Sequence, residues 1–212
     1  MSATRASKEY FAAVAGRWDQ IRGGYYDETI RDEAVAEARV SSKDVVADVG
    51  TGTGFMIAGL APLAAKVFGF DESPEMLAIA RKNLAAFRNV QLLEAPGQHL
   101  PVEDTSFDAV LASMYLHHAP EPPIAIAEMA RVLKPGGRLV IVDADRHNQE
   151  WMRAEMADRW LGFGRDQIHA WYAFAGLTHI RIRCARSDCH PVDPAGEKLS
   201  LSVFLAYGEK DS

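Results

Sequence analysis

The residues with the clearest potential for chemistry stand around three alternating glycines. Gly50, Gly52 and Gly54 follow an apolar run that contains the acidic residue Asp48, and Asp71 comes further along the chain. Glycines between a strand and a helix let the backbone approach a ligand closely. A carboxylate about 20 residues after the first glycine can accept hydrogen bonds from both hydroxyls of a ribose. The pattern therefore predicts a site for a nucleoside derivative.

The spacing of the glycines discriminates between nucleoside ligands. Dinucleotide sites use G-x-G-x-x-G around a pyrophosphate, whereas here the spacing is G-x-G-x-G and Phe55 stands at the place of the third dinucleotide glycine. Asp48 would repel a pyrophosphate, and no Gly-Lys-Ser/Thr of a P-loop follows. S-adenosylmethionine fits better, because it has a sulfonium, an ammonium and no phosphate. A nicotinamide-dependent oxidoreductase is the disfavoured alternative.

Four segments between residues 45 and 143 resemble, in the same order, the motifs of class I S-adenosylmethionine-dependent methyltransferases. They are residues 46–54, 70–77, 100–110 and 131–139. The subgroup they resemble is that of the ubiquinone/menaquinone C-methyltransferase-like proteins. The aromatic segments 18–22 and 147–163 are similar to methyltransferase domains that elsewhere follow a winged-helix repressor of the arsenic-sensor type. We expect this chain to begin directly with a helical cap, without such a repressor.

The resemblance implies a set of cofactor-binding residues. They are Asp48, Gly50, Thr51, Gly52 and Gly54 in the first motif, Asp71, Glu72 and Met76 in the second, Gly97 and Gln98 after the third strand, Ser113 after the fourth, and Trp18 and Arg22 in the cap. Asp71 would bind the ribose hydroxyls, and Ser113 would lie near the methionine amino group. Pro96 stands where the family usually has an adenine-binding aspartate, so we expect Gly97 or Gln98 to replace it.

Three histidines are candidates for acid–base chemistry. Methyl transfer depends mainly on positioning and on the exclusion of water, and a base is needed only if the acceptor must lose a proton. His117 and His118 follow the fourth expected strand and are our first choice, and His147 after the fifth strand is the second. A cap or packing role for these histidines stays open. The Trp- and Met-containing segment 151–163 either lines a substrate pocket or belongs to the core.

Strands alternate with helices over most of the chain, which predicts a Rossmann-like, doubly wound α/β fold. We expect strands at 45–49, 66–70, 90–94, 107–112, 138–142, 180–184 and 199–207, and helices at 7–17, 27–40, 55–61, 74–87, 122–133, 149–160 and 166–175. The seven strands would form a mostly parallel sheet with an antiparallel C-terminal pair. One methyltransferase domain would fill residues 1–212, with a helical cap (1–40), a cofactor-binding core (45–143) and a substrate-side region (144–212).

The overall composition narrows the choice of partners. The 212 residues carry a net charge of −6, which disfavours nucleic acid. No apolar run is long enough to span a membrane, and two cysteines are too few for a disulfide framework or a zinc site. We therefore expect a cytoplasmic enzyme that methylates a small-molecule substrate, with no metal and with a homodimer left open. A non-catalytic S-adenosylmethionine-binding module is the main alternative.

Overall fold

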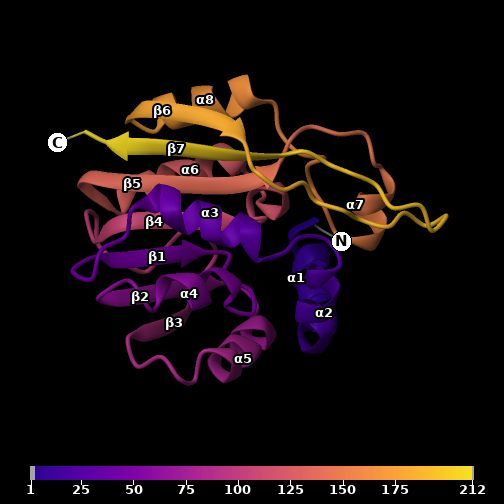
Figure 1. Ribbon diagram of the computed structural model, residues 1–212, viewed down its shortest axis with the longest axis horizontal. Helices are drawn as coiled ribbons and strands as arrows, with labels where there is room; N and C mark the ends of the chain where they lie inside the picture. The colour runs from indigo at the N-terminus through magenta and orange to yellow at the C-terminus, as the bar shows by residue number, and fades with distance from the viewer. Residues whose placement is uncertain (1–2, 212) are drawn as a thin grey trace.

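A seven-stranded sheet forms the centre of the computed structural model, which describes residues 3–211 and their side chains from Ser7 onward (Figure 1). The strands are β1 (Val45–Val49), β2 (Lys66–Asp71), β3 (Val90–Glu94), β4 (Phe107–Ser113), β5 (Leu133–Ala144), β6 (Leu177–Cys184) and β7 (Val203–Lys210). Their order is β3-β2-β1-β4-β5-β7-β6. The first five are parallel, and β7 runs antiparallel to both β5 and β6. The predicted fold class is confirmed.

Strand order reverses between β1 and β4. β1 pairs with β2 on one side and with β4 on the other, in the register Asp48 opposite Gly69 and Leu111. Connections that leave these two strands turn to opposite sides, so a crevice opens at their carboxyl ends. The glycine turn after β1 lies at this crevice.

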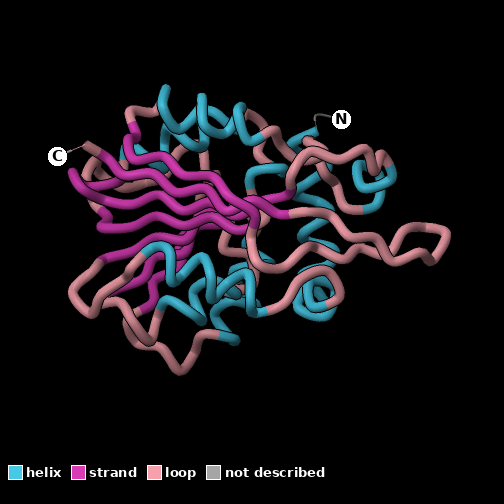
Figure 2. The backbone as a smooth tube through the Cα atoms, turned by 45° about the horizontal axis from the view of Figure 1, so that its top comes forward, coloured by secondary structure: helices cyan, strands magenta, loops and turns pink. Residues whose placement is uncertain are grey.

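Helices cover both faces of the sheet (Figure 2). They are α1 (Ala3–Val14), α2 (Trp18–Gly23), α3 (Glu28–Ala38), α4 (Phe55–Leu60), α5 (Pro74–Asn83), α6 (Pro122–Arg131), α7 (Trp151–Glu155) and α8 (Arg165–Phe174), with short 3-10 turns at Ala15–Arg17 and Leu116–His118. Apolar side chains of α3, α4 and α5 form one core cluster with one face of the sheet, and those of α6 and α8 form a second cluster with the other face.

Local capping explains where α5 begins. Ser73 accepts a hydrogen bond from the Met76 backbone N–H at 3.2 Å, and Pro74 occupies the first helical turn. A serine cap satisfies a donor that would otherwise be unpaired, and proline has no such donor to satisfy. The predicted helix start at residue 74 is confirmed.

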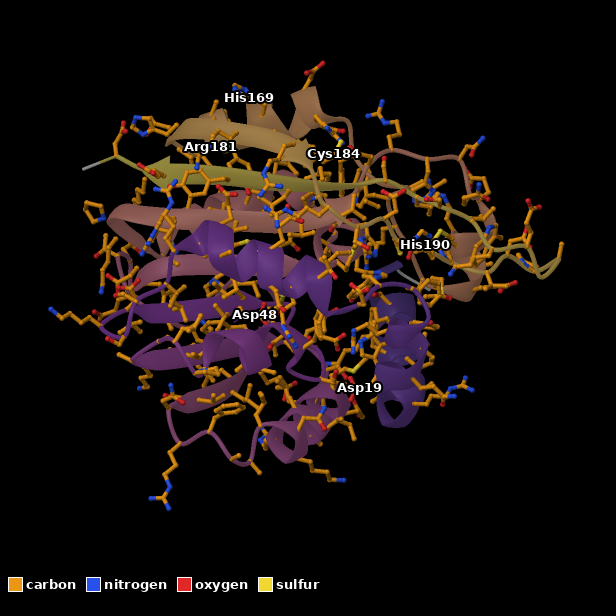
Figure 3. The ribbon with its side chains drawn as sticks, viewed as in Figure 1. Asp19, Asp48, His169, Arg181, Cys184 and His190 are labelled. Carbon is orange, nitrogen blue, oxygen red and sulfur yellow. The ribbon has the colours of Figure 1, made fainter. Side chains whose placement is uncertain are left out.

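The N-terminal helices form a cap at the carboxyl ends of the parallel strands, where Figure 1 shows α1 and α2 beside the sheet. Asp19 fixes this cap to the glycine turn, because its carboxylate accepts hydrogen bonds from the Thr53 hydroxyl at 2.6 Å and from the Asn83 amide at 3.0 Å. In Figure 3, Asp19 lies between α2 and α5. No helix within residues 3–211 is long and apolar enough to span a membrane.

Several element boundaries were predicted wrongly. β6 begins at Leu177 and not at residue 180, β7 covers Val203–Lys210 and not 199–207, and α5 ends at Asn83 and not at residue 87. The helix expected at 149–160 is only the short α7, because Ala157 adopts a left-handed conformation (φ +57°) and the chain then turns back toward the sheet. The strand expected at 138–142 is the longer β5, which starts at Leu133 and shifts register against β4 between Phe107 and Ala109. The early end of α7 matters for the site.

Candidate active site

The glycine turn after β1 is held by backbone and carboxylate contacts. Gly50, Gly52 and Gly54 all have positive φ, and the backbone N–H groups of Gly50 and Thr51 donate to the Phe70 carbonyl at 2.8 and 2.9 Å. The left-handed region favours glycine, since a Cβ atom is strained there. The turn leaves its backbone facing the crevice, and Gly50, Thr51 and Gly52 line the cleft that opens there.

Asp48 belongs to β1, just before this turn, and does not line the cleft. Its side chain is buried, and one carboxylate oxygen accepts a hydrogen bond from the Thr51 hydroxyl at 2.6 Å. Burial raises the pKa of Asp48 to about 7. The direct role of Asp48 in the structure is to hold Thr51, and its predicted contact with the cofactor stays a prediction. Gly54 also lies outside the lining, where a Cβ atom would be 2.6 Å from the Leu84 side chain.

Asp71 stands at the end of β2 and faces the same cleft. Its two carboxylate oxygens accept hydrogen bonds from the backbone N–H groups of Gly52 at 2.8 Å and Ser73 at 2.9 Å. Burial raises the pKa of Asp71 to about 6, although both hydrogen bonds oppose that rise. Each oxygen keeps a free lone pair, so the oriented carboxylate can accept the two hydroxyls of a ribose.

Tyr115 is a cleft residue that the sequence motifs did not indicate. Its ring packs on the backbone of the glycine turn, so closely that a Cβ atom at Gly50 would lie 2.4 Å from the ring. Its hydroxyl lies over Gly97, where a Cβ atom would be 2.4 Å from the oxygen. Tyr115 therefore leaves no room for a Cβ atom at either glycine, and Val49 also crowds the Gly97 position. The signal in the sequence was only that Tyr115 follows β4.

The remaining predicted cofactor residues line the cleft as well. They are Glu72, Met76, Gly97, Gln98 and Ser113 from the core, and Trp18 and Arg22 from the cap. The Arg22 guanidinium lies 3.9 Å from the centroid of the Phe55 ring and donates to the Tyr26 carbonyl at 3.2 Å. The Gln98 amide donates to the Glu121 carbonyl at 3.3 Å.

Three buried polar atoms near the glycine turn have no hydrogen-bond partner within the described part of the chain. They are Oδ1 of Asp48, Oγ of Ser113 and Nε of Arg22. Unpartnered buried polar groups are costly, so a ligand with complementary groups fits here. Ser113 and Arg22 line the cleft, and the amino-acid part of S-adenosylmethionine has groups for both: an ammonium for the Ser113 hydroxyl and a carboxylate for the Arg22 guanidinium.

A second cavity adjoins the cleft. Trp18, Tyr26, Met114 and His118 line both cavities. Its other apolar residues are Tyr25, Ala144, Met152, Met156 and Leu201. The sulfur of Met156 accepts hydrogen bonds from the hydroxyls of Tyr10 and Tyr25. We call this cavity the acceptor pocket, because a molecule in it would touch the wall it shares with the cleft.

His117 reaches the acceptor pocket as one member of a charged pair. Its Nδ1 lies 2.6 Å from Oδ1 of the fully buried Asp143, which also accepts the backbone N–H of Leu116 at 2.8 Å. Burial lowers the pKa of His117, but the carboxylates of Asp143 and Asp158 outweigh it and raise the pKa to about 9. His117 is therefore an imidazolium at neutral pH and a poor proton acceptor.

The other two candidate histidines are neutral. Burial and the charge on His117 hold the pKa of His118 well below its usual value, and they also lower the pKa of His147. Nδ1 of His118 lies 3.3 Å from the Ala157 carbonyl, and Nδ1 of His147 accepts the Gln149 backbone N–H at 3.3 Å. His118 lies on the wall shared by the two cavities, whereas His117 and His147 line the acceptor pocket alone.

Asp158 completes this polar group and was not predicted. Within residues 7–211, the ligand atoms of His117, His118 and Asp158 are the one set of three close enough to share a metal ion, all lying within 4.8 Å of one another. In the present arrangement both Nδ1 atoms already face oxygen acceptors, at Asp143 and Ala157. The three side chains thus form an acid–base group at the edge of the acceptor pocket.

Comparison with known proteins agrees with this geometry. Residues 47–141 match the family described as a methyltransferase domain. The chain contains a class I methyltransferase domain. It is 30% identical to 2-methyl-6-phytyl-1,4-hydroquinone methyltransferase 1 of Oryza sativa subsp. japonica, over 77% of this chain and 50% of that protein. It is 37% identical to demethylmenaquinone methyltransferase of Deinococcus radiodurans, over 66% of this chain and 60% of that protein.

The chain thus spans about half the length of the rice relative. Solved structures share its fold. A SAM-dependent methyltransferase from Aquifex aeolicus has a TM-score of 0.63 at 22% identity and covers 84% of this chain and 88% of its own. The cyclase SpnF has a TM-score of 0.78 at 19% identity, with 99% of this chain and 96% of its own covered.

Proposed function

We propose that this protein transfers the methyl group of S-adenosylmethionine to a small aromatic acceptor of the hydroquinone class. The observation that carries the proposal is the wall shared by the cofactor cleft and the acceptor pocket, because it lets two ligands meet. The named activities of the rice and Deinococcus relatives support a hydroquinone-type ring as the acceptor. The mostly apolar lining of the pocket suits such a ring.

Different cleft residues would bind different parts of the cofactor. Asp71 would accept the ribose hydroxyls, and Gly97 and Gln98 would face the adenine. Ser113 would accept the ammonium, and Arg22 would pair with the methionine carboxylate. S-adenosylmethionine supplies a methyl group on a positively charged sulfur, which leaves readily as a neutral thioether. The protein's task is then to align the acceptor and to exclude water.

The acceptor pocket provides charge where the acceptor needs it. An aromatic ring with a hydroxyl group becomes a much better nucleophile once the hydroxyl is ionised. His117, held as an imidazolium by Asp143, can stabilise the resulting oxyanion in a site from which water is largely excluded. The partner in this proposal is a small molecule. A net charge of −6 disfavours nucleic acid, and two free cysteines suit a reducing compartment such as the cytoplasm.

Two measurements on the purified protein test the proposal. Calorimetry with S-adenosylmethionine, S-adenosylhomocysteine and NAD should give heat with the first two and none with the third. Incubation with S-adenosylmethionine and a panel of naphthohydroquinones and benzohydroquinones should give S-adenosylhomocysteine and a product heavier by one methyl group. If neither S-adenosylmethionine nor S-adenosylhomocysteine gives heat, the proposed cofactor is wrong. Binding without transfer to any acceptor would favour the non-catalytic module.

A further inference from the structure

Asp158 is a buried carboxylate without a hydrogen-bond donor. Its side chain is only 4% exposed, and among residues 7–211 no group donates a hydrogen bond to it. Its nearest polar neighbours are Nε2 of His117 at 3.8 Å and Nδ1 of His118 at 4.0 Å, beyond hydrogen-bond distance. The carboxylate lines both the acceptor pocket and an open groove that it shares with Tyr10 and Trp160. A hydroxyl group of an acceptor bound in the pocket can therefore donate a hydrogen bond to it.

The chain is built to hold Asp158 in this position. Helix α7 ends at Glu155, and Ala157 takes a left-handed conformation, which costs about 1 kcal/mol or more for a residue other than glycine. The backbone N–H groups of Arg159 and Trp160 then both donate to the His117 carbonyl at 3.1 Å. These contacts place the carboxylate beside the imidazole of the same His117. Local strain that is maintained by tertiary contacts is typical of functional positions.

We propose that Asp158 is the catalytic proton acceptor of the methyl-transfer reaction and that His117 is the cation that holds the oxyanion formed. This inference rests on the proposed function. The O–H bond of the acceptor breaks, its electron pair stays on oxygen, and the proton binds a carboxylate oxygen of Asp158. The ring carbon then bonds to the methyl group as the sulfur–methyl bond of S-adenosylmethionine breaks, and that electron pair goes to the neutral thioether sulfur. The ring carbon loses its hydrogen as a proton to water, and Asp158 returns its proton to the oxygen.

The hydrogen bonds of the neighbours assign this role to Asp158 and not to a histidine. His117 lies between two carboxylates and therefore serves as a donor. Nδ1 of His147 accepts a backbone N–H, so the proton of this neutral ring is on Nε2, which donates. His118 is too weak a base, because burial and the charge on His117 lower its pKa.

The surroundings of Asp158 also suit a base that works near neutral pH. Burial raises the pKa of Asp158 to about 6, and the positive charge of His117 limits that rise. Other titratable or charged groups face it from each packed element. They are Tyr10 from α1, Tyr25 after α2, Asp143 from β5, Arg153 from α7 and Cys189 from the segment before β7. A base with a pKa close to the working pH is the efficient choice.

The variant Asp158→Asn tests the inference, with Glu155→Gln as the matched control. Glu155 is an exposed carboxylate on the last turn of α7, so its loss removes a nearby charge without touching the pocket. We expect Asp158→Asn to bind S-adenosylhomocysteine as tightly as the unmodified protein, within about threefold, and to lose about 100-fold or more in kcat/KM. Glu155→Gln should keep both its affinity for S-adenosylhomocysteine and its kcat/KM. Asp158→Ser, a smaller side chain, keeps the test valid if the amide disturbs the loop.

The pH profile and the acceptor's own acidity separate catalysis from a structural role. The unmodified protein should show an acidic limb near pH 6 in kcat/KM, which Asp158→Asn should lose. The variant should regain most of its rate with a nitro-substituted hydroquinone, because that acceptor ionises without a base. An unchanged pH profile and unchanged rate in Asp158→Asn would overturn the inference while leaving the proposed function intact.

Two other outcomes are distinguishable. If the unmodified protein transfers no methyl group to any hydroquinone, the proposed function fails, and the inference with it. If a chelator abolishes activity, Zn²⁺ or Co²⁺ restores it, and Asp158→Asn no longer binds the ion, then Asp158 is a metal ligand and the proton-acceptor role is overturned.

Discussion

The cofactor cleft and the acceptor pocket share a wall but are built in different ways. The cleft is formed by short segments that directly follow β1, β2, β3 and β4, with a lid from the cap. The acceptor pocket gathers residues from distant parts of the chain, such as Tyr25, Met114, His147 and Leu201. One cavity is thus tied to the sheet, which every related fold retains, and the other to loops that can change without disturbing it.

Changes in the two cavities should therefore have separable effects. A change in the cleft should weaken cofactor binding and leave the acid–base group intact. A change in the acceptor pocket should slow methyl transfer and leave cofactor affinity unchanged. The predictions below test this separation, starting with the largest expected effect.

Gly50→Ala should distort the glycine turn and so weaken binding in the cleft. The new Cβ would lie within 2.7 Å of two ring carbons and the Cβ of Tyr115, at a residue with φ +73°. Left-handed strain of about 1–2 kcal/mol and overpacking of about 1–3 kcal/mol should add, so that affinity for S-adenosylhomocysteine falls at least about 100-fold. Calorimetry measures the affinity and thermal unfolding measures the stability.

Gly136→Ala is the control for this substitution. Gly136 also has φ +73°, but no atom lies within 4 Å of its Cβ position. It should lose only the stability due to backbone strain, about 1–2 kcal/mol, and should bind the cofactor normally. Equal loss of affinity in both variants would show that the Tyr115 contact is irrelevant.

His117→Gln should damage only the acceptor pocket. Loss of the imidazolium should reduce kcat by about 100-fold, the effect typical for removing one oxyanion-stabilising donor. Affinity for S-adenosylhomocysteine should stay the same, because His117 does not line the cleft. A parallel fall in cofactor affinity would refute the separation of the two cavities.

The pH dependence of the protein's stability should also reveal the positive charge of His117. The pKa of His117 is raised to about 9, above the value of about 6.5 expected in the unfolded chain. The folded state therefore binds this proton more tightly, and the stabilisation is complete below pH ~6.5 and lost as the pH rises through about 9. Thermal unfolding should show that the advantage of the unmodified protein over His117→Gln, at most about 3 kcal/mol, shrinks over this window.

Asp71→Asn should reduce the affinity for the cofactor by about 10- to 100-fold, because hydrogen bonds to a charged acceptor contribute about 1.5–3 kcal/mol. A cofactor analogue that lacks both ribose hydroxyls supplies the control. If Asp71 binds these hydroxyls, the unmodified protein should lose the same affinity with the analogue, and the two changes should not add. Additive losses would mean that Asp71 acts on the turn through Gly52 and not on the ribose.

The same division explains what the sequence could predict. Strands β1 and β3 have the predicted bounds, and Asp71 and Gly97 lie on the predicted wall, because short-range spacing determines them. Asp158 was hidden in a segment with helical periodicity. That helix stops because the Ala157 backbone turns and the next amides bind the His117 carbonyl, a tertiary contact that no local pattern records. Asp143 and Tyr115 were given no role for the same reason, since their roles depend on residues far along the chain.

The smallest expected effect concerns the link between cap and cleft. Asp19→Ala removes the two hydrogen bonds that fix α2 to Thr53 and Asn83. Asp19 touches neither cavity, so the cofactor's own contacts remain, and affinity should fall only about three- to tenfold, mainly through faster dissociation as the cap opens more often. Asp32 is an exposed carboxylate on α3, and the control Asp32→Ala should not change the rate of S-adenosylhomocysteine dissociation in stopped-flow measurements.

Because Trp18 and Tyr26 of the cap region line both cavities, Asp19→Ala should also slow methyl transfer slightly. It is the one substitution expected to affect both cavities, since the cap is the part of the molecule that they share.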